Sequence, residues 1–116
     1  MSRIAPNAPD WLTARPIAHR GLHSKSNGII ENSISAAQAA VLHGFAIECD
    51  VQLSSDGEVF VFHDDTLDRV TAQSGRVGQT TAQALGAAIL RGSSDSIPTL
   101  TRFLKELNGQ VPLICE

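Results

Sequence analysis

An α/β fold with a mostly parallel sheet is the fold class that this 116-residue sequence predicts. Apolar strand-like segments alternate with helix-like segments, and residue types that carry chemistry stand at the strand ends. We predict strands at 16–21, 45–53, 58–65 and 111–116, and helices at 31–44, 80–90 and 98–109. A (β/α)8 barrel gathers such groups at the carboxyl ends of its strands, so it is the favoured architecture. A doubly wound sheet is the alternative, although the loop after the first strand lacks its G-x-G-x-x-G turn.

Capping residues mark the predicted helices. Asn32 or Ser33 is the expected N-cap of the first helix, and Gly44 is its expected end. Thr80 and Gln83 have the spacing of a capping box at the start of the second helix. Two apolar stripes at helical spacing predict the buried faces of the first and third helices: Ile34, Ala37 and Val41, and then Leu100, Phe103, Leu104 and Leu107.

Composition narrows the classes of partner. A hydrophobic fraction of 42% predicts a globular chain with a core, and a net charge of -3 excludes bulk attraction to nucleic acid. No segment reaches the roughly 20 apolar residues of a membrane span, and the first residues do not resemble a signal peptide. We therefore expect a cytoplasmic protein with a small-molecule partner. Cys49 and Cys115 lie in apolar runs without metal-ligand spacing and are expected to be buried free thiols.

Two carboxylates in the second strand indicate a cation site. Glu48 and Asp50 are two residues apart, so both side chains point to the same face of a strand. Two like charges in an apolar setting favour a divalent cation, and hard ions such as Ca²⁺ or Mg²⁺ prefer carboxylate oxygens. A solvated strand end is the competing interpretation of an isolated E-x-D pattern.

Two histidines are candidates for proton transfer. His63 follows the apolar run VFVF and would lie opposite Asp50 if Asp56 and Gly57 form a two-residue hairpin turn. A parallel arrangement with a tight crossover would also bring His63 to the end of the sheet that carries Asp50. At the end of the first strand, His19 and Arg20 combine an imidazole with a guanidinium that suits phosphate oxygens.

With these motifs in order, the sequence resembles the glycerophosphodiester phosphodiesterases from about residue 17 to residue 116. The motifs are H-R-G at 19–21, E-N-S at 31–33 where the family usually has E-N-T, E-x-D at 48–50, D-G at 56–57 and H-D at 63–64. They are followed by TLDRVT at 66–71, SGRV at 74–77 and IPTL at 97–100. The family fold is a (β/α)8 barrel.

The resemblance implies a metal-dependent phosphoric diester hydrolase that cleaves glycerophosphodiesters to glycerol 3-phosphate and an alcohol with Ca²⁺ or Mg²⁺. By position, His19 and His63 match the general base and general acid, and Arg20 matches the residue that grips the phosphate. Glu31 matches an acid close to metal and substrate. The implied metal ligands are Glu48, Asp50 and Glu116.

The resemblance also implies that residues 1–116 form the N-terminal part of the domain. The lysine expected two residues after Glu116 is absent, and so is the second half of a barrel of roughly 250 residues. We expect an α/β half barrel, truncated after the fourth strand, that self-associates through exposed sheet edges. A lysophospholipase D-type relative, or an inactive fragment that retains weak binding, is the alternative function.

Overall fold

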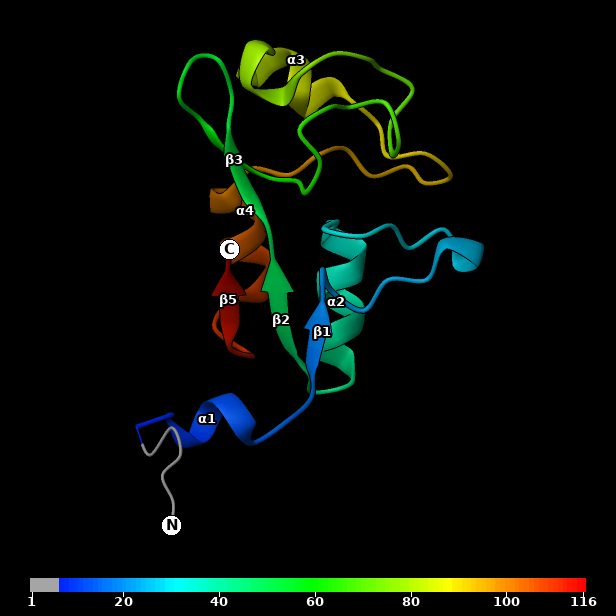
Figure 1. Cartoon of the computed structure of the whole chain (residues 1–116). Coiled ribbons are helices and arrows are strands. Elements are labelled where there is room, and N and C mark those ends of the chain that lie inside the picture. Colours follow the sequence, from blue (N-terminus) through cyan, green and yellow to red (C-terminus); the bar gives the residue numbers. More distant parts are fainter. Residues whose placement is uncertain (1–6) are drawn as a thin grey trace.

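A parallel sheet is the centre of the fold in the computed structural model, which describes residues 7–116 (Figure 1). Its strands are β1 (Ile17–His19), β2 (Ala46–Cys49) and β5 (Leu113–Cys115), in the order β1-β2-β5. All three point toward the top of Figure 1, so their carboxyl ends meet at one edge. The predicted α/β class with parallel strands is confirmed. Residues 1–6 belong to the predicted domain but lie outside the described residues. The expectation that the chain does not begin with a signal peptide concerns this segment in part.

One of the four predicted strands, 58–65, does not join the parallel sheet, and the antiparallel hairpin is the alternative that the structure has. Residues 58–65 supply only β4 (Val59–Val61), which pairs antiparallel with β3 (Val51–Leu53) in a separate two-stranded sheet. The predicted strand 45–53 is therefore two strands, β2 and β3, which follow one path in Figure 1 and change partners at Asp50. Of the four predicted strands, three join the parallel sheet of the described residues, and the last of them is β5.

Two helices cover the face of the parallel sheet that holds the main core. The first of these helices, α2 (Ile34–Leu42), connects β1 to β2. The short helix α1 (Asp10–Thr13) precedes β1 and is not one of the two. Ser33 is the N-cap of α2, because its side chain accepts a hydrogen bond from the Ala36 amide at 3.0 Å. The helix α4 (Leu100–Leu107) precedes β5 and buries Phe103 and Leu107 in the same core. Leu104, predicted on the buried stripe, is 49% exposed.

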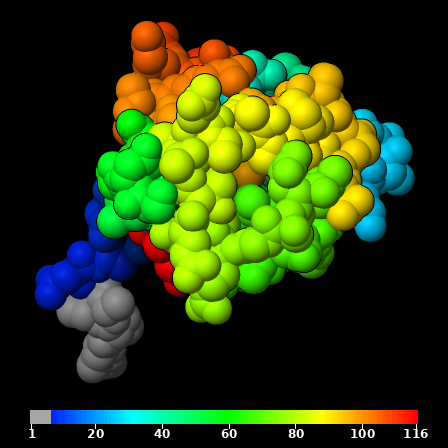
Figure 2. All heavy atoms as spheres, turned by 90° about the horizontal axis from the view of Figure 1, so that it is seen from above, coloured from blue at the N-terminus to red at the C-terminus, as the bar shows by residue number. Residues whose placement is uncertain are grey.

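The segment 54–98 builds a second core above the carboxyl ends of the strands. It contains β4, a 3₁₀ turn at Val77–Gln79 and the helix α3 (Ala82–Ala87). Another 3₁₀ turn, Lys25–Asn27, lies in the loop between β1 and α2. The second core includes Phe60, Phe62, Leu85 and Leu90 together with Ile30 from the loop before α2. Viewed from above, this segment spreads in green to yellow over that end of the molecule (Figure 2). The fold thus places the segment 54–98, a second layer above the parallel sheet, beside the predicted site.

Two sequence predictions about single residues need correction. Thr81, and not Thr80, caps α3, because Thr81 accepts from the Ala84 amide whereas the Thr80 hydroxyl donates to the Arg76 carbonyl of the preceding turn. Cys115 is exposed, while Cys49 is buried as expected.

Within the described residues, no helix has the length and apolar character needed to cross a membrane.

Candidate functional site

Three carboxylates meet at the carboxyl edge of the parallel sheet. Glu48 lies in the central strand β2, Asp50 follows that strand, and Glu116 follows β5. Each contributes an oxygen, and these oxygens all lie within 4.8 Å of one another. The parallel ladder produces this arrangement, since the Glu116 amide donates to the Cys49 carbonyl at 2.9 Å and the Val51 amide donates to the Glu116 carbonyl at 3.0 Å.

The donor set fits a hard divalent cation. Glu48 Oε2 is buried and has no hydrogen-bond partner among the described residues. Burial raises the pKa of Glu48. The hydrogen bond from the Arg20 amide opposes this effect, and the neighbouring carboxyl groups of Asp50 and Glu116 raise the pKa further. Crowded carboxylates and an unsatisfied buried oxygen are the surroundings that oxygen-seeking cations such as Mg²⁺ or Ca²⁺ relieve.

The H-R-G segment forms a left-handed turn around Glu48. Arg20 has φ 60° and Gly21 has φ 81°, which brings the Arg20 amide to 3.1 Å from Glu48 Oε1. Gly21 is required here for space as well as for conformation, since a Cβ at this position would lie 2.7 Å from the Cβ of Ala36 in α2. The strand β1 therefore ends in a turn that packs directly on the helix and presents its polar side chains to the acids.

The Arg20 guanidinium joins the two groups of acids. Its Nη1 donates to Glu31 Oε2 at 3.2 Å, and its Nε lies 3.6 Å from Asp50 Oδ2. His19 occupies the neighbouring position, paired in register with Glu48, and its Nε2 is 3.9 Å from Glu48 Oε1. The His19 side chain is 68% exposed, so the imidazole is open to a ligand.

Asn32 is a residue of this site that sequence reasoning treated only as a helix cap. Its side-chain amide donates to Asp50 Oδ2 at 3.1 Å, and its backbone amide donates to the Arg20 carbonyl at 2.8 Å. Asn32 is buried and has φ 57°, a left-handed conformation that asparagine tolerates better than most residues. The E-N-S motif was the available signal, because it holds an asparagine next to a predicted site acid.

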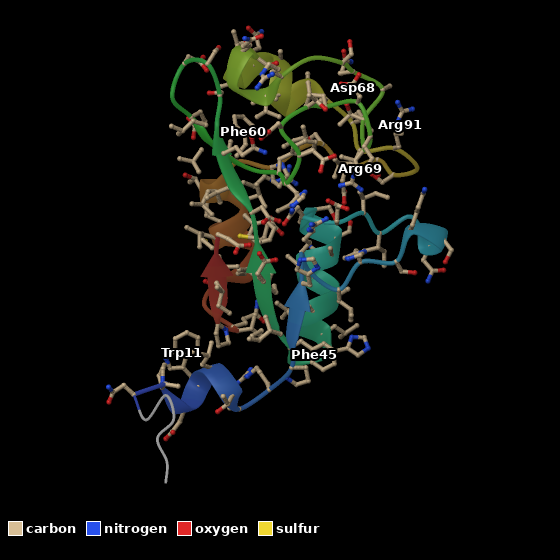
Figure 3. All side chains as sticks on the ribbon, viewed as in Figure 1. Trp11, Phe45, Phe60, Asp68, Arg69 and Arg91 are labelled. Carbon is tan, nitrogen blue, oxygen red and sulfur yellow. The ribbon has the colours of Figure 1, made fainter. Side chains whose placement is uncertain are left out.

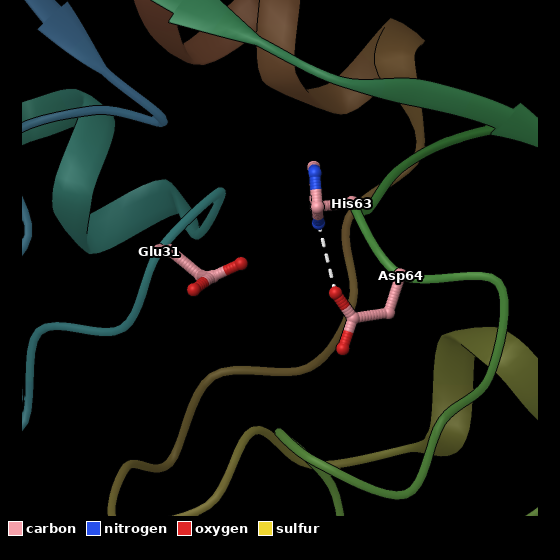
Figure 4. A group of neighbouring side chains, drawn as sticks. All are labelled: Glu31, His63 and Asp64. Carbon is pink, nitrogen blue, oxygen red and sulfur yellow. Dashed lines mark hydrogen bonds and ion pairs between the residues drawn. The ribbon is translucent and has the colours of Figure 1, made fainter.

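A second group of side chains contains His63, which the structure does not place opposite Asp50. The hairpin pairs Val51 with Val61, and the Phe62 amide donates to the Asp50 carbonyl at 2.9 Å. The register differs by one residue from the prediction, because the turn has three loop residues, 55–57, between Ser54 and Glu58. His63, Asp64 and Glu31 instead approach within 4.8 Å through one ligand atom each (Figure 4).

Arg69 holds this second group together, and no role was predicted for it although it lies in the TLDRVT motif. Its guanidinium donates four hydrogen bonds of 2.8 to 3.0 Å, two to Asp64 and two to Glu31. Figure 3 shows Arg69 between the segment 54–98 and the start of α2. The contact therefore ties the loop before α2 to the layer above the sheet.

Arg69 also sets the protonation of both acids. Its hydrogen bonds outweigh burial and, with a smaller effect of His63, lower the pKa of Asp64 to about 2. Burial acts to raise the pKa of Glu31, but Arg69 and the charge of Arg20 outweigh burial and keep that pKa below its usual value. Asp64 is thus ionised at neutral pH and lies 2.8 Å from His63 Nδ1.

A parallel α/β sheet with acids, imidazoles and a guanidinium at the carboxyl ends of its strands has the site location of α/β barrel enzymes. The model of the glycerophosphoryl diester phosphodiesterase family matches residues 19–115, and the chain belongs to this family. A glycerophosphodiester phosphodiesterase of Caldanaerobacter subterraneus is 42% identical over 91 residues, which are 72% of this chain and 36% of that protein.

Solved structures agree with this assignment. A glycerophosphodiester phosphodiesterase from Agrobacterium tumefaciens superposes with a TM-score of 0.79 and 31% identity, over 87% of this chain and 45% of that one. An Oleispira antarctica phosphodiesterase in complex with the product sn-glycerol-3-phosphate has a TM-score of 0.77 and 29% identity, over 87% and 43% of the two chains. The chain spans less than half the length of the curated relatives that it matches.

Proposed function

We propose that this chain carries catalytic groups for the hydrolysis of glycerophosphodiesters to glycerol 3-phosphate and an alcohol, assisted by Mg²⁺ or Ca²⁺. The observation that carries the proposal is the convergence of Glu48, Asp50 and Glu116, with a buried unsatisfied oxygen on Glu48, beside Arg20 and His19. Family membership and the product bound to the Oleispira antarctica relative support the substrate class.

Glu48, Asp50 and Glu116 would hold the divalent cation. When bound, the cation would offset negative charge on the phosphoryl oxygens. Asn32 keeps one oxygen of Asp50 in place through its 3.1 Å hydrogen bond. The Arg20 amide does the same for Glu48 Oε1, which leaves Glu48 Oε2 for the cation.

Arg20 would bind the phosphate. Its guanidinium is oriented on one side by Glu31 and on the other by Asp50, and the Nε atom has no hydrogen-bond partner among the described residues. A planar guanidinium offers two parallel donors to two phosphate oxygens, which a lysine cannot reproduce. Glu31 would act as a positioning residue because it contacts Arg20 from one side and Arg69 from the other.

His19 and His63 would transfer the protons. His19, as general base, takes a proton from a water molecule as the water oxygen forms its bond to phosphorus. His63, as general acid, donates a proton to the alcohol oxygen as the bond between that oxygen and phosphorus breaks. Overall, water adds across that bond. Asp64 accepts a hydrogen bond from His63 Nδ1, which leaves Nε2 to face the substrate.

The proposal is tested with Glu48→Gln in the full chain. Titration calorimetry with Mg²⁺ and Ca²⁺ measures the cation, and glycerol 3-phosphate release from glycerophosphocholine measures the reaction. We expect the substitution to weaken cation binding at least about tenfold and to abolish product formation, because a neutral amide is a poorer ligand for a hard cation. Glu58→Gln, in the exposed turn region of the hairpin, is the matched control and should change neither. Equal cation affinity in Glu48→Gln would refute the metal site, and absence of product from the unsubstituted chain would refute the reaction.

A further inference from the structure

A cavity of about 280 Å³ lies beside the candidate site and is lined by both Glu31 and Arg69, which are in contact with each other. One wall comes from the loop before α2 and the other from the segment 54–98. Its apolar lining consists of Ile29, Ile30 and Val70, and its cationic lining of Lys25, Arg69 and Arg91. Figure 3 shows Arg69 and Arg91 on the side of the segment 54–98 that faces the loop.

Backbone contacts hold both walls in place. In the loop, the Ser24 amide donates to the Ile29 carbonyl at 2.8 Å, and the Ile29 amide returns a bond to the Ser24 carbonyl at 3.0 Å. In the other wall, the Arg91 amide donates to the Val70 carbonyl at 2.8 Å. The walls meet so closely that a Cβ at Gly28 would lie 3.0 Å from the carbonyl oxygen of Gly92. These backbone contacts within the chain therefore define both walls of the cavity.

The cavity carries an excess of positive charge. Glu31 is the acid in its lining, and this carboxylate is already shared by Arg20 and Arg69. Lys25 and Arg91 form no ion pair with a carboxylate of the residues that the structure describes, and the Arg91 Nη2 donates only to the Asp68 carbonyl at 3.1 Å. Two cations are therefore free to meet a ligand, and a cationic ligand would be repelled by both.

The position of Glu31 connects this cavity to the reaction. Glu31 lines the cavity and also lies 3.2 Å from the guanidinium of Arg20, the proposed phosphate-binding group. A substrate whose phosphodiester rests on Arg20 has one of its two alcohol portions within reach of the cavity. At about 280 Å³ the cavity is smaller than the roughly 300–1,000 Å³ of sites for drug-sized ligands, so it suits a short polyol and not a long acyl chain.

We propose that this cavity selects the alcohol portion of the substrate and favours an alcohol that carries a second phosphate, such as glycerol phosphate, over a cationic alcohol such as choline. The inference rests on the proposed function, because the cavity acts on the same substrate. Arg91 supplies a planar donor fork for phosphate oxygens, and Lys25 supplies a point charge from the opposite wall. The apolar lining would contact the carbon chain of the polyol.

The test compares two substrates, glycerophosphoglycerol phosphate and glycerophosphocholine, with the full chain and its Lys25→Gln/Arg91→Gln double variant. We expect kcat/KM of the unsubstituted chain to favour the phosphorylated substrate about three- to tenfold at low salt, since exposed charge pairs contribute up to a few-fold each. The double variant should lose this preference, because it no longer attracts the second phosphate and no longer repels the cationic choline group. Lys105→Gln, an exposed lysine of α4, is the control and should keep the preference.

Binding provides a readout that does not depend on turnover. Glycerophosphoglycerol phosphate, titrated without metal, should shift the backbone amide resonances of Lys25, Val70 and Arg91, and the double variant should bind it at least about threefold more weakly. Equal binding by the two proteins, or a preference for glycerophosphocholine, would overturn the inference. Loss of turnover with both substrates while this binding persists would count against the proposed function alone.

Discussion

Replacing Arg69 with glutamine should raise the pKa of Asp64 and destabilise the contact between the loop before α2 and the segment 54–98. Arg69 donates two hydrogen bonds to Asp64 and two to Glu31. The pKa of Asp64 is lowered from 3.8 to about 2, first by the hydrogen bonds of Arg69 and to a lesser degree by His63. A neutral glutamine cannot supply the charge and reaches at most one of the two carboxylates.

The size of the effect follows from the pKa of Asp64. A drop of nearly two pKa units corresponds to an upper limit of about 2.5 kcal/mol, at about 1.4 kcal/mol per unit. Because the Arg69 side chain is 51% exposed, solvent screening reduces this, and we expect a loss of about 1 kcal/mol in the free energy of unfolding at pH 7. The folded-state pKa lies below the unfolded-state value, so this stabilisation is present above about pH 4 and is lost as the pH falls toward 2.

Carbon-13 NMR titration of the side-chain carboxyls measures the pKa of Asp64 and Glu31 directly, and urea denaturation at pH 7 measures the stability. We expect both pKa values to rise in Arg69→Gln, that of Asp64 by at least one unit. Arg102→Gln removes an exposed arginine of α4 that makes no ion pair with the described residues and serves as the control. An unchanged pKa of Asp64 in Arg69→Gln would refute the assignment of Arg69 as the residue that keeps this acid ionised.

Two further predictions concern the first strand and its turn. His19→Ala should lower kcat about 10²–10⁴-fold with cation affinity little changed, measured by product release and calorimetry, whereas His43→Gln, at the exposed end of α2, should retain activity; near-normal kcat in His19→Ala would exclude it as the general base. Gly21→Ala should cost about 2–4 kcal/mol of stability in urea denaturation, since it combines a positive φ with a Cβ 2.7 Å from Ala36. Gly57→Ala has a positive φ and open space, so its cost should be only about 1 kcal/mol, and equal costs would contradict the steric argument.

Much of the site could be predicted because strand ends in a parallel sheet converge. Glu48 and Asp50 share a face through the two-residue period of a strand, and Glu116 joins them because β5 runs parallel to β2. The position of His63 could not be predicted in the same way. A two-residue and a three-residue hairpin loop are both compatible with the sequence SSDG, and they differ by one residue in register.

The sequence by itself determined the alternation of strands and helices, most of the apolar faces of α2 and α4, and the chemistry at the end of β1, because these depend on short-range periodicity and on residue type. Only the tertiary structure decided which acids share a partner. Glu31 and Asp64 are far apart in the sequence, and they meet on Arg69 because the segment 54–98 folds back over the strand ends. That segment packs through its own core, and the charges it brings to Glu31 follow from side-chain contacts that no local pattern specifies.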